Sequence, residues 1–284
     1  MKGRADASDR TGVSLVRSYP AATYFCLTFL VSWSAALAVA LPHLLRRETL
    51  PTLTGVLMFP AMLLGPSTCG ILMTLWTDAR NGLGELFGRM RRWRIRARWY
   101  LLLLIPPTLV LGVLLCMSTI VSADYWPNFF LLGLLFGVPA GLFEEIGWMG
   151  FAFPKLWLKR SAVGSAVVLG LTWSLWHLPV INFLGSATPH GKYWLPFFFA
   201  FAAAMTAMRV IISWVYANTG SVGLAQVLHV SSTGSLVVFS PSHATPAQEV
   251  RWYVVYALVL WVVVAAVIIK FKMSLRGDNQ LSAA

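Results

Sequence analysis

The sequence contains few charged residues for its length. Only 11% of its 284 residues are Asp, Glu, Lys or Arg, and 58% are hydrophobic, whereas soluble domains carry about 25% charged residues. The mean hydropathy is +0.71. These values exclude a soluble globular domain and indicate an integral membrane protein. We expect no cleavable signal peptide, because residues 1–19 are polar and basic and the first apolar run is long enough to span a membrane.

Acidic residues and cysteines are also scarce. The chain has 10 Asp and Glu against 22 Lys and Arg, a net charge of +12. Because Arg209 is the only basic residue in the interior of a predicted span, we interpret the excess as membrane-orientation signals and expect no nucleic-acid partner. Three cysteines, Cys26, Cys69 and Cys116, lie in apolar runs without CxxC spacing. We therefore expect reduced core residues.

Several motifs of known chemistry are missing as well. The sequence has no HExxH, no GxSxG and no glycine-rich phosphate-binding motif, so it does not support the hydrolase classes that these motifs define. No internal repeat is visible, although repeats are usual in secondary transporters.

The long apolar runs define the fold class. Eight windows of about 20 residues are each long enough to cross the ~30 Å hydrocarbon layer. We predict an all-α polytopic membrane protein with about eight transmembrane helices in a single membrane domain, residues 22–272, between cytoplasmic segments at 1–21 and 273–284. The windows are 22–41, 55–76, 100–121, 129–153, 162–181, 194–216, 221–239 and 252–271.

The basic residues predict an orientation. With alternate links on alternate sides, 17 Lys and Arg fall on the side of the two termini and four on the other. By the positive-inside rule both termini are cytoplasmic, and we expect an integral protein of a bacterial plasma membrane. The arginine-rich link at 89–99 either binds anionic headgroups or, as we prefer, is an orientation signal with Trp93 and Trp99 at the membrane interface.

Five ionisable residues lie inside predicted spans: Glu144, Glu145, His177, Arg209 and His229. A charge at membrane depth costs a few kcal/mol, so it calls for a partner or a function. At a rise of ~1.5 Å per residue, the first glutamate and the two histidines lie at depths that agree within about a turn and a half. We therefore expect them to share one cavity, with the arginine slightly shallower.

These side chains support more than one chemistry. Glu144 beside a histidine can take a proton from water, while a second histidine donates to the oxyanion. His229 and Thr233 are spaced i, i+4, so the hydroxyl can be a second donor. Alternatively, Glu144, His177 and His229 are candidate zinc ligands. A proton relay for transport is a third possibility, which the missing repeat disfavours.

Three motifs in order resemble a known family, the CAAX-protease and bacteriocin-processing (CPBP, Abi or type II CAAX prenyl endopeptidase) membrane proteins. The matching stretches are Glu144-Glu-Ile-Gly-Trp-Met149, Trp173-Ser-Leu-Trp-His177 and His229-Val-Ser-Ser-Thr233, and Asn218-Thr-Gly-Ser221 resembles the lead into the last motif. The resemblance covers about residues 129–235.

The resemblance implies an intramembrane endopeptidase with an eight-helix bundle and a cavity open to the cytoplasm. It implies that Glu144 and His177 activate water and that His229 helps to hold the oxyanion, with Trp173 as the motif aromatic. Members are often labelled metalloproteases, but the resemblance favours a metal-independent mechanism, with zinc as the alternative. The implied substrate is a prenylated or otherwise membrane-anchored peptide or protein. It does not predict an oligomeric state.

Two motif residues differ from the family pattern. Met149 stands where the family has arginine, and Thr233 stands where it has asparagine. Because Glu145 thereby loses its usual partner, we predict that Arg209, from another helix, replaces the cation. A non-catalytic scaffold or a bacteriocin-immunity protein is the alternative to an active enzyme.

Overall fold

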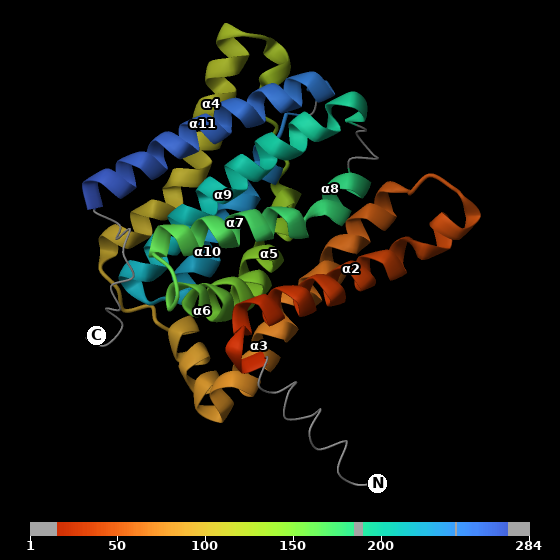
Figure 1. Ribbon diagram of the computed structural model, residues 1–284. Coiled ribbons are helices and arrows are strands. Elements are labelled where there is room, and N and C mark those ends of the chain that lie inside the picture. The colour runs from red at the N-terminus through yellow and green to blue at the C-terminus, as the bar shows by residue number, and fades with distance from the viewer. Residues whose placement is uncertain (1–15, 185–189, 242, 272–284) are drawn as a thin grey trace.

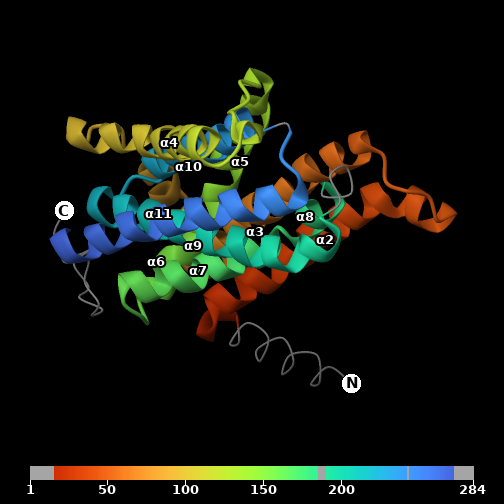
Figure 2. The ribbon, with the colours of Figure 1, turned by 90° about the horizontal axis from the view of Figure 1, so that it is seen from above.

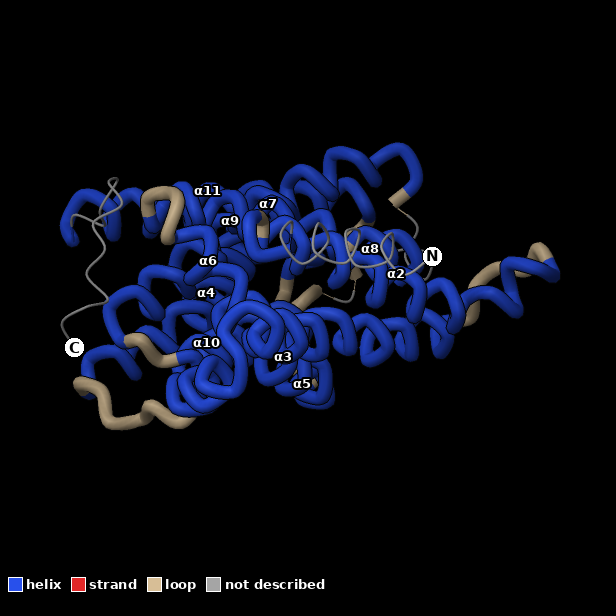
Figure 3. The backbone as a smooth tube through the Cα atoms, turned by 60° about the horizontal axis from the view of Figure 1, so that its bottom comes forward, coloured by secondary structure: helices blue, strands red, loops and turns tan. Residues whose placement is uncertain are grey.

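The computed structural model describes residues 16–184, 190–241 and 243–271, and these ranges form helices and loops without a strand (Figure 1, Figure 3). The predicted terminal segments 1–21 and 273–284 lie largely outside them. The α-helices are α2 (Pro20–Arg46), α3 (Thr52–Met90), α4 (Ile105–Ile120), α5 (Leu134–Gly147), α6 (Phe153–Trp157), α7 (Ala162–Trp176), α8 (Leu178–Leu184), α9 (Trp194–Thr219), α10 (Val222–Phe239) and α11 (Pro246–Phe271). Short 3-10 turns are η1 (Ala97–Leu104), η2 (Ala123–Tyr125), η3 (Leu131–Gly133) and η5 (Gly191–Tyr193), and a π-helical turn, η4 (Trp148–Ala152), joins α5 to α6.

The described residues confirm an all-α polytopic membrane protein. Seven helical segments are long and apolar enough to cross a bilayer. The remaining predicted window, 162–181, the fifth along the chain, forms the shorter helix α7, which ends at Trp176, and α8 begins after His177. The fifth window is thus interrupted at a residue that the sequence analysis selects as catalytic.

Two expectations about the apolar runs are wrong. Helix α3 does not end near Trp76 but continues to Met90, and the chain turns sharply within it at Ala79 (φ 57°, ψ −158°). Of the three free cysteines, only Cys69 is buried, whereas Cys26 and Cys116 are exposed on the outside of the bundle. They are therefore not core residues.

Local sequence explains where the helices of the site begin and end. The Ser161 hydroxyl accepts a hydrogen bond from the Gly164 amide at the start of α7, and Ser221 does the same for Leu224 at the start of α10. Such side-chain caps satisfy amide groups that a helix start leaves unpaired. Helix α9 ends at Gly220, whose φ of 61° suits glycine. These signals fix the lengths of α7, α9 and α10.

The helices pack in two groups, with α4, α5 and α10 on one side and α6, α7 and α9 on the other (Figure 2). Within the groups, α5 lies against α10 and α7 against α9. A Cβ atom on Gly137 would lie 2.7 Å from the Gly234 Cα, and one on Gly170 would lie 2.7 Å from the Thr206 Cα. Small residues at such crossings let membrane helices approach closely. The backbones of α5 and α7, by contrast, make few close contacts.

Candidate active site

The two adjacent glutamates of α5 point to different neighbours. Successive residues of an α-helix are separated by about 100° around its axis, so Glu144 faces α7 while Glu145 faces α9 and α10. Both side chains are almost completely buried, at 1% and 0% exposed. Their hydrogen-bond partners differ entirely.

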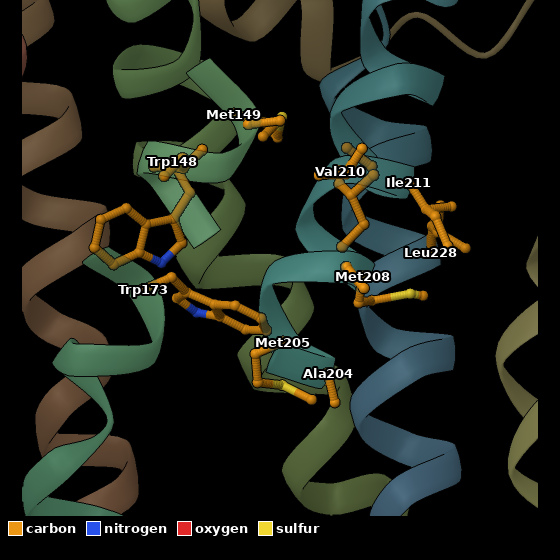
Figure 4. Close-up of a cluster of buried hydrophobic side chains, with 14 of the residues drawn as sticks. Trp148, Met149, Trp173, Ala204, Met205, Met208, Val210, Ile211 and Leu228 are labelled. Carbon is orange, nitrogen blue, oxygen red and sulfur yellow. The ribbon is translucent and has the colours of Figure 1, made fainter. Parts of the chain in front are cut away.

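Two indole groups hold Glu144. Its Oε2 atom accepts from Trp173 Nε1 at 2.7 Å and from Trp148 Nε1 at 3.2 Å. Figure 4 shows these two indole rings side by side among buried side chains of α9. Trp148 lies one turn after the glutamate, and Trp173 reaches it from α7. The carboxylate is therefore oriented by neutral donors from two helices.

Glu145 forms a charged cluster. Its Oε1 atom lies 2.6 Å from Arg209 Nη1 and 2.6 Å from His229 Nδ1, and all three side chains are at most 1% exposed. The Arg209 guanidinium carbon also lies 4.2 Å from the centre of the Trp173 ring, a cation–π arrangement. The structure thus contains the ion pair between α5 and α9 that the missing motif arginine led us to predict.

His177 lies at the break between α7 and α8. Its Nδ1 atom lies 2.8 Å from the Trp173 carbonyl oxygen. Because a carbonyl only accepts hydrogen bonds, Nδ1 must carry the proton, which leaves the lone pair of the neutral ring on Nε2. Trp173 therefore contacts both members of the predicted water-activating pair, Glu144 through its indole and His177 through its carbonyl.

His229 is positioned differently. Its Nδ1 atom faces the Glu145 carboxylate, while its Nε2 atom is buried and has no hydrogen-bond partner among the described residues. The same holds for Glu145 Oε2 and for the Nε and Nη2 atoms of Arg209. Buried polar atoms without partners are uncommon in proteins. Several in one cluster indicate a place where water or a polar ligand group binds.

The structure does not bring every predicted site residue into this cluster. The Thr233 side chain makes no hydrogen bond among the described residues, although it lies one turn after His229. The Asn218 amide binds the Trp214 carbonyl at the end of α9, beside a separate pocket. Met149, at the motif-arginine position, is buried within η4, and Figure 4 shows it away from the two indole rings.

Sequence reasoning did not select two of the neighbouring tryptophans. Trp148 holds Glu144, and Trp176 packs edge-on against His177 with ring centroids 4.8 Å apart. The spacing of Trp148 to Glu144, i to i+4 on one helix, was the available signal. Trp176 has no comparable signal, because its contact with the adjacent histidine depends on the helix break.

The described residues include no group of three or more His, Cys, Asp and Glu side chains arranged to hold a metal ion. The zinc alternative built from Glu144, His177 and His229 therefore has no ligand group in the described part of the chain. The glutamate is held by indoles, and the second histidine by Glu145.

Comparison with known proteins bears on the same region. Residues 126–235 match the family described as Rce1-like, type II CAAX prenyl endopeptidase Rce1-like. The chain carries an Rce1-like segment. A curated relative, CAAX prenyl protease 2 of Methanococcus maripaludis, is 33% identical over 111 residues, which are 38% of this chain and 39% of the relative. The family resemblance that the motifs indicate is thereby confirmed for this segment.

The Rce1-like segment begins directly after η2, extends through most of α10 and includes every residue of the buried cluster. Helices α2, α3, α4 and α11 lie outside it. The chain spans about two fifths of the length of the curated relative that it matches.

Proposed function

We propose that this chain is an intramembrane endopeptidase that hydrolyses a peptide bond near the end of a membrane-anchored protein, with CAAX-type prenylated proteins as the substrate class. The Rce1-like segment supports this class of reaction. The observation that carries the proposal is the double role of Trp173, which binds Glu144 through its indole N–H and His177 through its carbonyl. A carboxylate and an imidazole are thereby held by one residue, the first by its indole N–H and the second by its backbone carbonyl.

In the proposed mechanism, these two side chains activate a water molecule. Glu144 accepts one proton of this water as its oxygen attacks the scissile carbonyl, a general-base step, while the unprotonated Nε2 of His177 accepts a hydrogen bond from the other O–H and orients the water. The proton then passes to the amide nitrogen, the C–N bond breaks, and an acid and an amine are released. Glu144 can accept this proton because its two hydrogen-bond donors, the indoles of Trp148 and Trp173, are neutral.

The negative charge on the carbonyl oxygen needs a donor, and we assign this role to His229. Its Nδ1–H faces the Glu145 carboxylate, which only accepts, so the ring donates to the oxyanion from Nε2 in the form that carries a proton on both nitrogens; Nε2 has no protein partner among the described residues. Preorganised donors of this kind stabilise tetrahedral intermediates. Glu145 and Arg209 orient this imidazole, whereas Thr233 makes no contact that would assign it to the oxyanion.

The proposal requires no metal ion, and both termini are proposed to be cytoplasmic. A quenched-fluorescence peptide with a prenylated cysteine, incorporated in liposomes with the protein, tests activity directly. We expect Glu144→Gln and His177→Gln each to abolish cleavage without lowering the unfolding temperature, and EDTA to leave the rate unchanged. His43→Gln, at the end of α2, is the matched control and should remain active.

The alternatives give other outcomes. A cellular phenotype that survives both substitutions identifies a non-catalytic scaffold or immunity protein. A rate that EDTA abolishes and zinc restores shows a metal-dependent enzyme. Proton-coupled flux in the same liposomes shows a transporter.

A further inference from the structure

The separate pocket beside Asn218 lies at the boundary of the membrane. It has a volume of about 300 Å³ and is lined by Arg98, Trp99, Leu102, Trp214 and Asn218. Arg98 and Trp99 stand near the start of the apolar segment Ala97–Ile120, and Asn218 stands next to the end of the apolar segment Gly191–Thr219. The pocket is therefore at the level where lipid headgroups meet the hydrocarbon layer.

Two tryptophans and a leucine form an apolar wall of this pocket. Trp99 is 8% exposed and lies edge-on to Trp214, with ring centroids 5.0 Å apart. Residues i and i+3 share a face of a 3-10 helix, so Leu102 of η1 lies beside Trp99. Indole rings at this level of a membrane pack against the upper part of acyl chains. The wall therefore suits the glycerol end of a lipid.

Arg98 supplies a positive charge to the same pocket. Its guanidinium carbon lies 5.6 Å from the centre of the Trp99 ring, and its exposed side chain forms no ion pair among the described residues. None of the lining residues is acidic, and the arginine-rich link at 89–99 contains no Asp or Glu. Asn218 donates one amide N–H to the Trp214 carbonyl, so its second N–H remains available. The pocket thus joins hydrogen-bond donors and an unpaired cation to an apolar wall.

The end of α9 has to be included in this charge balance. The C-terminus of a helix carries a partial negative charge, which disfavours an anion. Arg92 lies there, because a Cβ atom on Gly220 would be only 2.5 Å from its Nη1 atom. Arg92 therefore compensates the helix end, which leaves Arg98 to attract an anion into the pocket.

The backbone of the link is bound to the helices around it. The Ser221 hydroxyl, at the start of α10, donates to the Arg92 carbonyl at 2.7 Å, and the Tyr100 hydroxyl of η1 donates to the Trp93 carbonyl at 2.6 Å. An orientation signal needs only positive charge on one side of the membrane, whatever its conformation. These contacts therefore indicate a second role for the link, besides orientation.

We propose that this pocket binds the phosphate group of an anionic phospholipid, with Arg98 at the phosphate and the acyl chains along Leu102 and the two indoles. Guanidinium groups bind phosphates through paired, charge-assisted hydrogen bonds. Basic pockets between membrane helices on the cytoplasmic side bind such headgroups in other proteins. The pocket shares no residue with the buried cluster around Glu144 and Glu145, so the proposal does not depend on the proposed function.

Native mass spectrometry of the detergent-solubilised protein tests this site. The protein is titrated with phosphatidylglycerol, which is anionic, or with phosphatidylcholine, which carries the same phosphate beside a cationic choline. We expect the first phosphatidylglycerol to bind about fivefold more tightly, the effect of roughly one basic residue near a membrane surface. Equal affinity for the two lipids would overturn the proposal.

Variants then distinguish a site from general attraction by positive charge. Arg98→Gln should weaken phosphatidylglycerol binding at least about tenfold, because a charge-assisted hydrogen bond is lost, and Arg98→Lys should weaken it less. Arg94→Gln removes the same charge from an exposed residue of the link that does not line the pocket. This matched control should bind as the wild type does, and equal losses in Arg94→Gln and Arg98→Gln would reject the site.

Inorganic phosphate separates the two sources of the anionic group. In excess over the lipid it should leave phosphatidylglycerol bound, because it lacks the acyl chains that contact the apolar wall. Displacement of the lipid would assign the pocket to a soluble phosphate compound and overturn the lipid proposal. If Arg98→Gln does not fold, the two lipids compared on the wild-type protein and on Arg98→Lys still decide.

Discussion

Replacement of Arg209 by leucine tests the buried ion pair most directly. The guanidinium and the Glu145 carboxylate are both 0% exposed and 2.6 Å apart. Leucine removes the cation and leaves a carboxylate in the membrane interior with only His229 as a partner. We expect the protein to lose stability and the imidazole to lose its orientation.

The magnitude follows from the geometry. Removal of one member of a buried ion pair costs about 3–5 kcal/mol, because the remaining charge is unpaired. At roughly 2–4 °C per kcal/mol for a chain of this size, the unfolding temperature should fall by about 10 °C. The double variant Arg209→Leu/Glu145→Gln leaves no unpaired charge, so we expect it to be more stable than the single variant.

The assay is thermal unfolding in detergent, followed by tryptophan fluorescence, with peptide cleavage measured in parallel. Arg251→Leu, an exposed arginine on α11, is the control and should unfold within about 1 °C of the wild type, as surface substitutions usually do. The reasoning is refuted if Arg209→Leu also unfolds within 1 °C, or if the double variant is less stable than the single one.

Three further predictions concern the tryptophans, a helix crossing and the turn in α3. Trp173→Phe removes the indole N–H that donates to Glu144 at 2.7 Å and should lower kcat about 10- to 100-fold. The control Trp176→Phe should lower kcat far less, because the Trp176 indole N–H has no partner among the described residues. Gly170→Ala forces a Cβ atom against the backbone of α9 and should destabilise the protein by about 1–3 kcal/mol. The control Gly88→Ala places its Cβ atom in open space, so the unfolding temperature should stay the same or rise slightly in the same assay. Ala79→Gly should raise the unfolding temperature, because its backbone conformation costs a non-glycine residue about 1–3 kcal/mol; an unchanged or lower temperature would contradict this.

Much of the fold could be predicted because hydropathy reports directly on membrane spans. Each of the eight apolar windows contains a helix of the structure, but the continuation of α3 beyond Trp76 and the interruption of the window 162–181 at His177 were not predicted. The continued part of α3 contains Asp78, Arg80, Glu85 and Arg89 and therefore has little hydropathy signal, and Arg89 binds the Gly150 carbonyl in the structure. The turn at Ala79 also has no signal, since alanine normally favours a continuous helix.

The ionisable residues of the site could be predicted because a charged side chain inside a membrane has a high free-energy cost. The cost of burial alone selected Glu144, Glu145, His177, Arg209 and His229, and the structure joins them through direct contacts or through Trp173. Resemblance to the family motifs predicted the site less well at neutral polar residues. Asn218 and Thr233 make no hydrogen bond with the cluster among the described residues, because a hydroxyl or amide can instead bind its own helix or stay unpaired at little cost.

The glycine crossings described above have a mechanical consequence for this site. They join α5 to α10 and α7 to α9 by backbone contact, whereas α5 and α7 meet mainly through side chains. The seam between the two groups is closed at Glu144 by a single indole hydrogen bond from α7, and such a bond contributes only about 1–3 kcal/mol. One residue further along α5, the Glu145–Arg209 ion pair crosses the same seam, so α5 stays joined to α9 there, whereas side chains alone connect Glu144 with α7.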